Sequence, residues 1–165
     1  VCSSDLIEGQ VLQIFADAYT PVVDSSAIPT GEIASVEGTP MDFRTEKQIG
    51  QDIRADFEQL HFTGGYDHNY VLGRSGEKKI MANAYCRESG IALEAATDCC
   101  GVQFYAGNFI GEQTGKGGAA YHDRSAFCLE SQFYPNAVNE PDFPSPVVKA
   151  GDTYHTETSY RFYLR

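Results

Sequence analysis

The sequence predicts an all-β protein, an antiparallel β-sandwich with one short helix. Three observations support this fold class. Short runs of alternating apolar and polar residues recur along the chain, and turns rich in glycine and proline separate them. The 165 residues include 10 Tyr and 10 Phe, which favour strands, beside 16 Gly and 7 Pro, which favour turns. Helices do not alternate with the strands, so a parallel α/β sheet is not expected.

The first half of the chain contains two expected strands and the only helix candidate. We expect strands over residues 10–17 and 31–36, and a helix over residues 45–60. The helix is predicted because its apolar side chains recur at helical spacing and form one stripe. Thr45 and Gln48 have the spacing of a capping box at its start. The stripe is formed by Ile49, Ile53, Phe57 and Leu60.

The beginning of the chain differs in character from the rest. It starts at Val1, and the first methionine is Met41. We therefore expect residues 1–9 to be a non-native segment and exclude them from the fold argument. Residues 10–165 are expected to form one domain, or part of a larger one.

The second half is predicted to consist of strands, apart from one long loop. Residues 78–87 and 90–97 form the clearest hairpin, because apolar and polar residues alternate on both sides of a turn. A strand over residues 101–107 comes next. Residues 108–123 form a glycine-rich loop suited to cover a ligand. Residues 153–164 close the chain as a long strand.

Residues 126–132 form a further strand, which carries a single carboxylate, Glu130. Carboxylates are rarely buried in full unless they are paired or functional, so this one needs an explanation. The simplest explanation is alternation along the strand, in which every second side chain faces water. The two faces are Phe127, Leu129 and Ser131 on one side and Cys128, Glu130 and Gln132 on the other. Taken alone, the strand favours a solvated face over a functional carboxylate.

Charge and composition exclude several classes of partner. The formal net charge is −11, whereas nucleic acid and anionic membrane surfaces are bound by basic faces. No apolar run is long enough to span a bilayer. We therefore expect no nucleic acid and no membrane as partner. A neutral small molecule such as a sugar is compatible with this charge.

The five cysteines predict a reducing compartment. Their number is odd, and their spacing fits neither a zinc site nor a disulfide framework. The adjacent Cys99 and Cys100 could not bridge each other without strain. No leader with a basic start and an apolar centre is visible. We therefore expect reduced cysteines and a cytoplasmic location.

The sequence lacks the motifs of common cofactor and nucleophile sites. The four histidines have no His or Cys partner at ligand spacing, so no metal site is expected. No phosphate loop, dinucleotide fingerprint or nucleophile elbow is present. Asp67 and His68 look reactive, but neighbours on an extended segment point to opposite sides, so at most one faces a site. A turn in which Asp67 accepts from backbone amides explains the pair equally well.

Three polar and three aromatic residues together have the composition of a sugar site. Carboxylates and amides bind sugar hydroxyls, and aromatic faces cover the apolar C–H patches. The residues are Asp67, Gln103 and Glu130, with Tyr66, Phe104 and Tyr105. Composition alone is a weak signal for such a site.

Seven motifs in order strengthen this signal. They are residues 16–22 (ADAYTPV), 28–33 (IPTGEI), 38–44 (GTPMDFR), 65–70 (GYDHNY), 101–109 (GVQFYAGNF), 127–132 (FCLESQ) and 143–146 (FPSP). Together they resemble the C-terminal half of the aldose 1-epimerase, or galactose mutarotase, family. The resemblance runs from about Val11 to the end of the chain. It implies a many-stranded β-sandwich and an isomerase that interconverts the α and β anomers of galactose and glucose, with no metal or organic cofactor.

The resemblance also implies roles for three residues. Glu130 takes the place of the general base, with Ser131 after it where the family more commonly has Thr. Asp67 takes the place of a residue that binds sugar hydroxyls, and Gln103 that of a substrate contact in some members. Residues 10–165 then correspond to the C-terminal part of an aldose 1-epimerase domain.

The family's general-acid histidine is expected to be missing. It belongs to an Asn-His-Ser-Tyr-Phe-Asn-Leu motif upstream of the matched region, and this motif does not occur in the sequence. The histidines that are present, His61, His68, His122 and His155, do not match its position. We therefore expect an enzyme as the parent protein and little activity from this chain alone. The alternative is a noncatalytic carbohydrate-binding or regulatory protein of the same fold.

Overall fold

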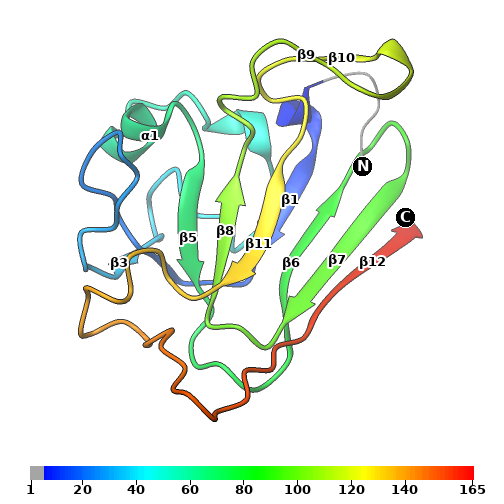
Figure 1. The fold of residues 1–165 in the computed structure, drawn as a ribbon. Helices are drawn as coiled ribbons and strands as arrows, with labels where there is room; N and C mark the ends of the chain where they lie inside the picture. The colour runs from blue at the N-terminus through cyan, green and yellow to red at the C-terminus, as the bar shows by residue number, and fades with distance from the viewer. Residues whose placement is uncertain (1–5) are drawn as a thin grey trace.

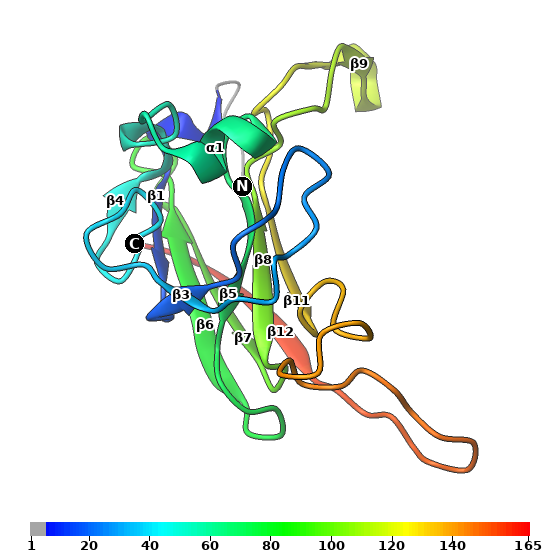
Figure 2. The same ribbon diagram turned by 90° about the vertical axis from the view of Figure 1, so that its left-hand side faces the viewer.

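The chain folds as two antiparallel sheets that lie face to face (Figure 1, Figure 2). The structure is a computed structural model, and it describes residues 6–165. Sheet 1 has the order β12 (Thr158–Leu164), β7 (Ile91–Thr97), β6 (Lys79–Tyr85), β1 (Val11–Ile14) and β4 (Lys47–Gln48). Sheet 2 has the order β11 (Cys128–Gln132), β8 (Gly101–Tyr105), β5 (Asp67–Val71), β2 (Ala18–Tyr19) and β3 (Ala34–Ser35). The predicted antiparallel sandwich is confirmed.

The remaining elements are short. A two-stranded ribbon, β9 (Gln113–Thr114) and β10 (Ala120–Tyr121), lies in the glycine-rich loop. The helical elements are η1 (Ile7–Gly9), η2 (Ile49–Gln51), α1 (Glu58–Thr63) and η3 (Lys116–Gly118). Figure 2 shows the ribbon projecting from one end of the sandwich and the irregular segment before β12 projecting from the other.

The core lies between the two sheets and is rich in aromatic rings. Every second residue of the strands points into it, including Leu12 and Ile14 of β1 and Phe104 of β8, all 0% exposed. Phe43, from the loop before β4, contacts the ring of Tyr66 at 5.0 Å and that of Phe104 at 5.5 Å between centroids. Both pairs are edge-to-face, a geometry that aromatic rings prefer. The aromatic composition therefore serves the core as well as any surface site.

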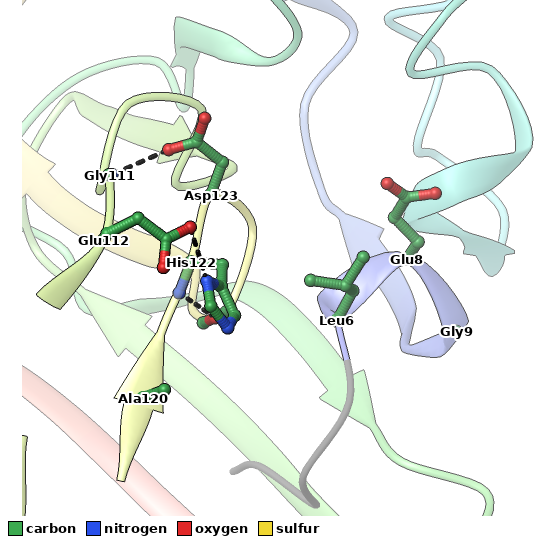
Figure 3. Close-up of a pocket in the computed structure, with 9 residues that line it drawn as sticks. Leu6, Glu8, Gly9, Gly111, Glu112, Ala120, His122 and Asp123 are labelled. Carbon is green, nitrogen blue, oxygen red and sulfur yellow. Dashed lines mark hydrogen bonds and ion pairs between the residues drawn. The ribbon is translucent and has the colours of Figure 1, made fainter. Parts of the chain in front are cut away.

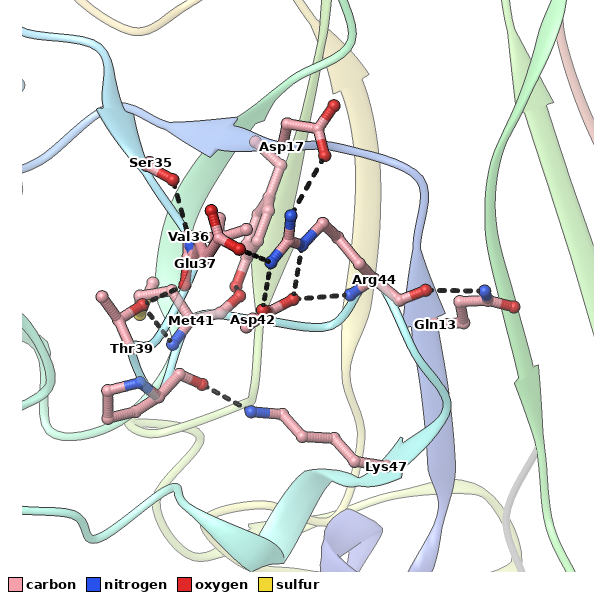
Figure 4. A network of polar contacts seen from close by, with 12 residues as sticks. Gln13, Asp17, Ser35, Val36, Glu37, Thr39, Met41, Asp42, Arg44 and Lys47 are labelled. Atoms are coloured by element: carbon pink, nitrogen blue, oxygen red, sulfur yellow. Dashed lines mark hydrogen bonds and ion pairs between the residues drawn. The ribbon is translucent and has the colours of Figure 1, made fainter.

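The loop between β3 and β4 is tied to the sandwich by buried hydroxyls and by one arginine. The hydroxyl of Tyr66 donates to the carbonyl of Pro40, and that of Tyr70 donates to the carbonyl of Met41, each at 3.0 Å. The Arg44 guanidinium donates to the Asp42 carboxylate at 2.7 Å, and the carboxylates of Asp17 and Glu37 lie within 4 Å of it (Figure 4). These contacts fix the loop that carries Phe43 into the core.

The helix predicted over residues 45–60 is wrong. Residues 47–48 pair with β1, residues 49–51 form η2, and a helix starts only at Glu58. Ile49, Ile53 and Leu60 of the predicted stripe are buried, but strand, turn and helix bring them to the core separately. A side chain at Gly50 would overlap Glu8, with a Cβ–Cβ distance of 2.7 Å, so the close packing of η1 on η2 overrides helical periodicity here.

The strands of the second half agree with the predictions. The hairpin of β6 and β7, the strand β8 and the strand β11 all lie within the expected ranges. In β12 only residues 158–164 of the expected 153–164 are extended. The expectation that residues 1–9 are non-native stays a prediction; Ile7 of this segment is buried in the core, and residues 1–5 lie outside the described part.

No helix in the described residues is long and apolar enough to cross a membrane. Cys99, Cys100 and Cys128 are free thiols, and Cys2 lies outside the described residues.

Candidate functional site

The candidate site lies on the outer face of sheet 2, where β5, β8 and β11 run side by side. Both neighbours of β8 are antiparallel to it, and Gln103 of β8 pairs with Asn69 of β5 and with Glu130 of β11. Two residues further along, Tyr105 pairs with Asp67 of β5. Because side chains alternate along a strand, Asp67, Gln103 and Glu130 all point away from the core.

Asp67 and His68 point to opposite sides of β5, as expected for neighbours on a strand. His68 is 0% exposed and faces the core, where its ring meets Tyr19 edge-to-face at 5.9 Å. Burial lowers the pKa of His68 to about 4, so this imidazole is neutral near pH 7. Asp67 is half-buried and faces outward. Of the pair, only Asp67 is placed to meet a ligand.

One open cavity of about 370 Å³ contains all three residues that the sequence analysis selected. Its volume is at the lower end of the range of small-molecule sites. It is lined by Asp67, Gln103, Glu130, Tyr105, Phe109, Gln132, Ala27 and Pro135. The cavity therefore offers two carboxylates, two amides and two aromatic rings, the combination that recognises a sugar.

The polar side chains of this cavity are linked to each other. Gln103 Nε2 donates to Asp67 Oδ1 at 2.7 Å. Gln132 Nε2 donates to Gln103 Oε1 at 3.2 Å. Glu130 is exposed beside this row, so its carboxylate is accessible to a ligand. The amides thus form an ordered polar row next to an accessible carboxylate.

The electrostatics of the cavity depend on the partial burial of Asp67 and on the negative charge of Glu130. Burial raises the pKa of Asp67, and the hydrogen bond from Gln103 partly offsets this effect by favouring the ionised form. Burial also raises the pKa of the neighbouring Cys128 thiol, and the negative charge of Glu130 and a hydrogen bond with its carboxylate add to that rise. Cys128 is therefore held in the thiol form next to the carboxylate.

The structure adds an aromatic platform that the sequence analysis did not select. Phe109 is 70% exposed at the cavity edge. Its ring lies on Gly64, where an added Cβ would be 3.0 Å from it, and its backbone N–H donates to the Tyr105 hydroxyl at 3.0 Å. Sequence spacing does not predict these two contacts, because Phe109 and Gly64 both lie in loops, whose paths have no regular period. An exposed aromatic ring that such contacts keep in place can pack against an apolar C–H face of a ligand such as a sugar.

A larger cavity lies elsewhere, between η1 and the β9–β10 ribbon (Figure 3). It measures about 1060 Å³ and is widely open. Glu8 is paired with Arg54 and Arg124, each within 3.0 Å, and Glu112 with His122 at 2.7 Å, while Asp123 accepts a hydrogen bond from the Gly111 backbone N–H at 2.7 Å. None of the three selected residues lines it. We therefore place the candidate site in the smaller cavity on sheet 2.

The four histidines lie outside the sheet 2 cavity. His68 is in the core, His122 lines the larger cavity, and His155 lines a separate one near the segment before β12. His61 of α1 lies 3.4 Å from the Asp56 carboxylate. Among the described residues no group of three or more His, Cys, Asp or Glu side chains is placed to hold a metal ion. No histidine of the described residues therefore lines the sheet 2 cavity.

Comparisons with known proteins point to one family. The family model described as aldose 1-epimerase matches residues 2–161. Galactose mutarotase of Sus scrofa is 45% identical over 150 residues, and aldose 1-epimerase of Escherichia coli is 36% identical over 159 residues. These alignments cover 90% and 94% of this chain, but 42% and 45% of the two relatives. The chain thus spans less than half the length of the curated relatives it matches.

Solved structures show the same relation. An aldose epimerase homologue from C. elegans superposes with a TM-score of 0.80 at 28% identity, over 98% of this chain and 47% of that one. A galactose 1-epimerase from Lactobacillus acidophilus superposes with a TM-score of 0.71 at 24% identity, which supports the fold alone. The sandwich described above therefore corresponds to about half of a larger solved fold.

Proposed function

The chain belongs to the aldose 1-epimerase family, and we propose that it is the part of such an enzyme that carries the general base and part of the sugar site. The reaction is the interconversion of the α and β anomers of a free aldohexose such as galactose or glucose. The observation that carries the proposal is that Asp67, Gln103 and Glu130 share one cavity on three neighbouring strands. The relatives' names, galactose mutarotase and aldose 1-epimerase, support the reaction type.

The proposed chemistry rests on what each side chain can do. The carboxylate of Glu130 accepts the proton of the anomeric hydroxyl while the ring oxygen receives a proton from an acid. The bond between C1 and the ring oxygen then breaks and leaves an aldehyde. Rotation about C1–C2 presents the other face of the aldehyde, and the same transfers run in reverse to close the ring. A carboxylate suits this cycle because one group must both accept and return a proton.

Asp67, Gln103 and the two rings are proposed to hold the sugar during ring opening. Asp67 accepts hydrogen bonds from sugar hydroxyls, and Phe109 covers an apolar C–H face. The open-chain sugar must stay bound while C1–C2 turns, so contacts away from C1 keep its remaining hydroxyls in place.

The acid is proposed to come from outside this cavity's own residues, in the portion of the relatives that this chain does not cover. We therefore expect the 165-residue chain alone to show little or no mutarotation above the buffer rate. A noncatalytic sugar binder is the rival function, and it requires Asp67 and Gln103 but not Glu130. A cytoplasmic location stays a prediction.

Polarimetry on freshly dissolved α-glucose, with the full-length protein that contains this chain, tests the proposal. Glu130→Gln keeps the shape of the side chain and removes the base, so the catalysed rate should fall by roughly 10²–10⁴-fold. Galactose binding, measured by calorimetry, should change much less. Glu112→Gln is the matched control, since Glu112 is an exposed carboxylate paired with His122 outside the cavity.

Two results would overturn the proposal. Full activity of the Glu130→Gln variant would remove Glu130 from the reaction. Sugar binding by the wild-type protein without any mutarotation would favour the noncatalytic binder.

A further inference from the structure

We propose that Gln132 is a positioning residue, which fixes the Gln103 amide in the orientation that donates to Asp67. The three side chains form a chain of hydrogen bonds, from Gln132 Nε2 to Gln103 Oε1 at 3.2 Å and from Gln103 Nε2 to Asp67 Oδ1 at 2.7 Å. The role of these hydrogen bonds in sugar binding rests on the proposed function. The orientation of the Gln103 amide does not depend on that function.

The register of sheet 2 explains how three separate strands supply this chain. Gln132 of β11 lies opposite Gly101 of β8, and Asp67 of β5 lies opposite Tyr105. Gln103 is therefore the diagonal neighbour of both, at a separation that long side chains can bridge. The hydrogen bonds run obliquely across the sheet rather than straight across it.

Gly101 leaves Gln132 without a side chain directly across the sheet. A Cβ at Gly101 would overlap Asn69 Oδ1 and lie 3.0 Å from the Tyr134 ring, so a larger residue cannot be placed there without movement. Because Gly101 has no side chain, the residue directly opposite Gln132 offers it no competing side-chain contact. The amide of Gln132 is then free to reach its diagonal partner, Gln103.

The carboxylate of Asp67 determines the donor-to-acceptor direction of this row of hydrogen bonds. An ionised carboxylate only accepts hydrogen bonds, so Asp67 requires the NH₂ group of Gln103. The carbonyl of Gln103 must then point the other way and needs a donor. Gln132 supplies its NH₂ group for this purpose. Gln103 is half-buried, which makes an unpaired carbonyl costly and gives the donor of Gln132 its effect.

The consequence for a sugar is a fixed set of acceptors. Gln103 contacts Oδ1 of Asp67, while Oδ2 has no hydrogen bond among those of the described residues and stays available to a hydroxyl. If the Gln103 amide rotated by half a turn, its carbonyl oxygen would face Oδ1 and repel it. Gln132 prevents this rotation without touching the sugar at C1.

The test reverses the polarity at position 132 and reads the result at Asp67 by ¹³C NMR titration of its carboxyl group. The carboxylate introduced by Gln132→Glu can only accept, so it draws the NH₂ group of Gln103 away from Asp67. The pKa of Asp67 should rise by about 1. Gln132→Lys can only donate, so it should keep the amide in place and cause no rise.

The same substitution in a Gln103→Met variant separates the effect of the hydrogen bonds on the pKa of Asp67 from the direct effect of the added charge. Gln132 and Asp67 lie two strands apart, so the negative charge that Gln132→Glu adds, acting through water, would raise the pKa of Asp67 by only roughly 0.3. In the Gln103→Met background the chain is broken, and Gln132→Glu should have only this small effect. An equal rise in both backgrounds, or no rise in either, would overturn the proposal.

Kinetics of the full-length protein give an independent reading. Gln132→Leu should raise KM for the sugar by roughly three- to tenfold and change kcat by less than about twofold, because binding rather than proton transfer is disturbed. A fall in kcat at constant KM would contradict a positioning role at Asp67. Absence of mutarotation in the wild type would refute the proposed function, and the NMR titration would still decide the role of Gln132.

Discussion

Strands β8 and β12 have similar alternating patterns, but only β8 buries its apolar residues. Val102 and Phe104 of β8 are 0% exposed, whereas Tyr160, Phe162 and Leu164 of β12 are 48%, 60% and 81% exposed. β8 lies inside sheet 2 and has sheet 1 opposite, while β12 is the edge of sheet 1 (Figure 1). Alternation thus predicts a strand and its two faces, but the covering of a face depends on the other sheet.

The open side of the sandwich lies between the two edge strands β11 and β12. The strands meet where the Tyr160 hydroxyl donates to the Leu129 carbonyl at 2.7 Å. Beside this contact, an open cavity of about 320 Å³ is lined by Leu93, Phe127, Cys128, Leu129, Tyr160 and Phe162. The candidate site is on the other face of β11, so the same strand borders the candidate cavity and the exposed apolar side.

The largest expected difference between the two regions is in stability. Phe104→Ala removes a ring that contacts three other aromatic rings in the core, and should lower the free energy of unfolding by about 3–5 kcal/mol. Phe162→Ala on β12 is the matched change, and should cost less than about 1 kcal/mol. Urea unfolding followed by circular dichroism measures both. Equal losses would mean that the β12 face is covered in solution.

Acid should destabilise the protein through the core face of sheet 2. The folded pKa of His68 is about 4 because of burial, whereas an unfolded histidine has a pKa of about 6.5. Between these values the unfolded state binds a proton that the folded state does not, so stability falls by up to about 3 kcal/mol as the pH drops from 6.5 to 4. Unfolding in urea at several pH values in this window measures the loss.

His68→Phe isolates this effect, because it keeps a ring beside Tyr19 and cannot titrate. Asp67 contributes with the opposite sign: burial raises its pKa, so the folded state holds that proton more tightly and gains stability as the pH falls. His155→Phe changes an exposed histidine and serves as control. If the free energy of unfolding of His68→Phe fell with pH as steeply as that of the wild type, the burial of His68 would be contradicted.

The exposed face of β12 should promote association. A row of large apolar side chains on an edge strand is a contact site for other chains. Replacing Phe162 and Leu164 with Thr keeps strand propensity and removes most of the apolar surface, so self-association should weaken by roughly tenfold, or about 1.4 kcal/mol. Sedimentation velocity over a concentration series measures it. Association that is insensitive to both changes would place the contact elsewhere.

The smallest effect is expected at the Arg44 network. The Arg44 side chain is 35% exposed and those of Asp17 and Glu37 are mostly in water, so the ion pairs (Figure 4) are screened. Arg44→Met should cost less than about 1 kcal/mol, and the cost should shrink in high salt. Thermal unfolding at two salt concentrations tests this. A cost like that of Phe104→Ala would show that Arg44, more than the Tyr66 and Tyr70 hydroxyls, holds the loop that carries Phe43 in place.

The parts of the fold that the sequence predicts correctly depend on local pattern. β6, β7, β8 and β11 alternate clearly, and the orientation of Glu130 away from the core is a consequence of the spacing in its own strand. The helix over residues 45–60 fails because its apolar stripe is satisfied by long-range contacts, above all the packing of Gly50 against Glu8. Periodicity cannot detect such a contact between distant segments.

The site shows the same limit. Motif resemblance selects Asp67, Gln103 and Glu130, and the structure brings them together. The motif resemblance does not select Gln132, whose role depends on the pairing register of the strands. It does not select Phe109 either, whose role depends on a loop that folds back over Gly64. Alternation does place Gln132 on the face of Glu130. What it cannot give is the diagonal contact to Gln103.

Sheet 2 is proposed to carry a sugar site with Glu130 at the anomeric centre. A crystal structure of the full-length protein with galactose would test this proposal. We predict the anomeric hydroxyl within about 2.6–3.2 Å of the Glu130 carboxylate and other hydroxyls on Asp67. A sugar bound in the cavity beside η1, or bound on sheet 2 with its anomeric carbon turned away from Glu130, would contradict it.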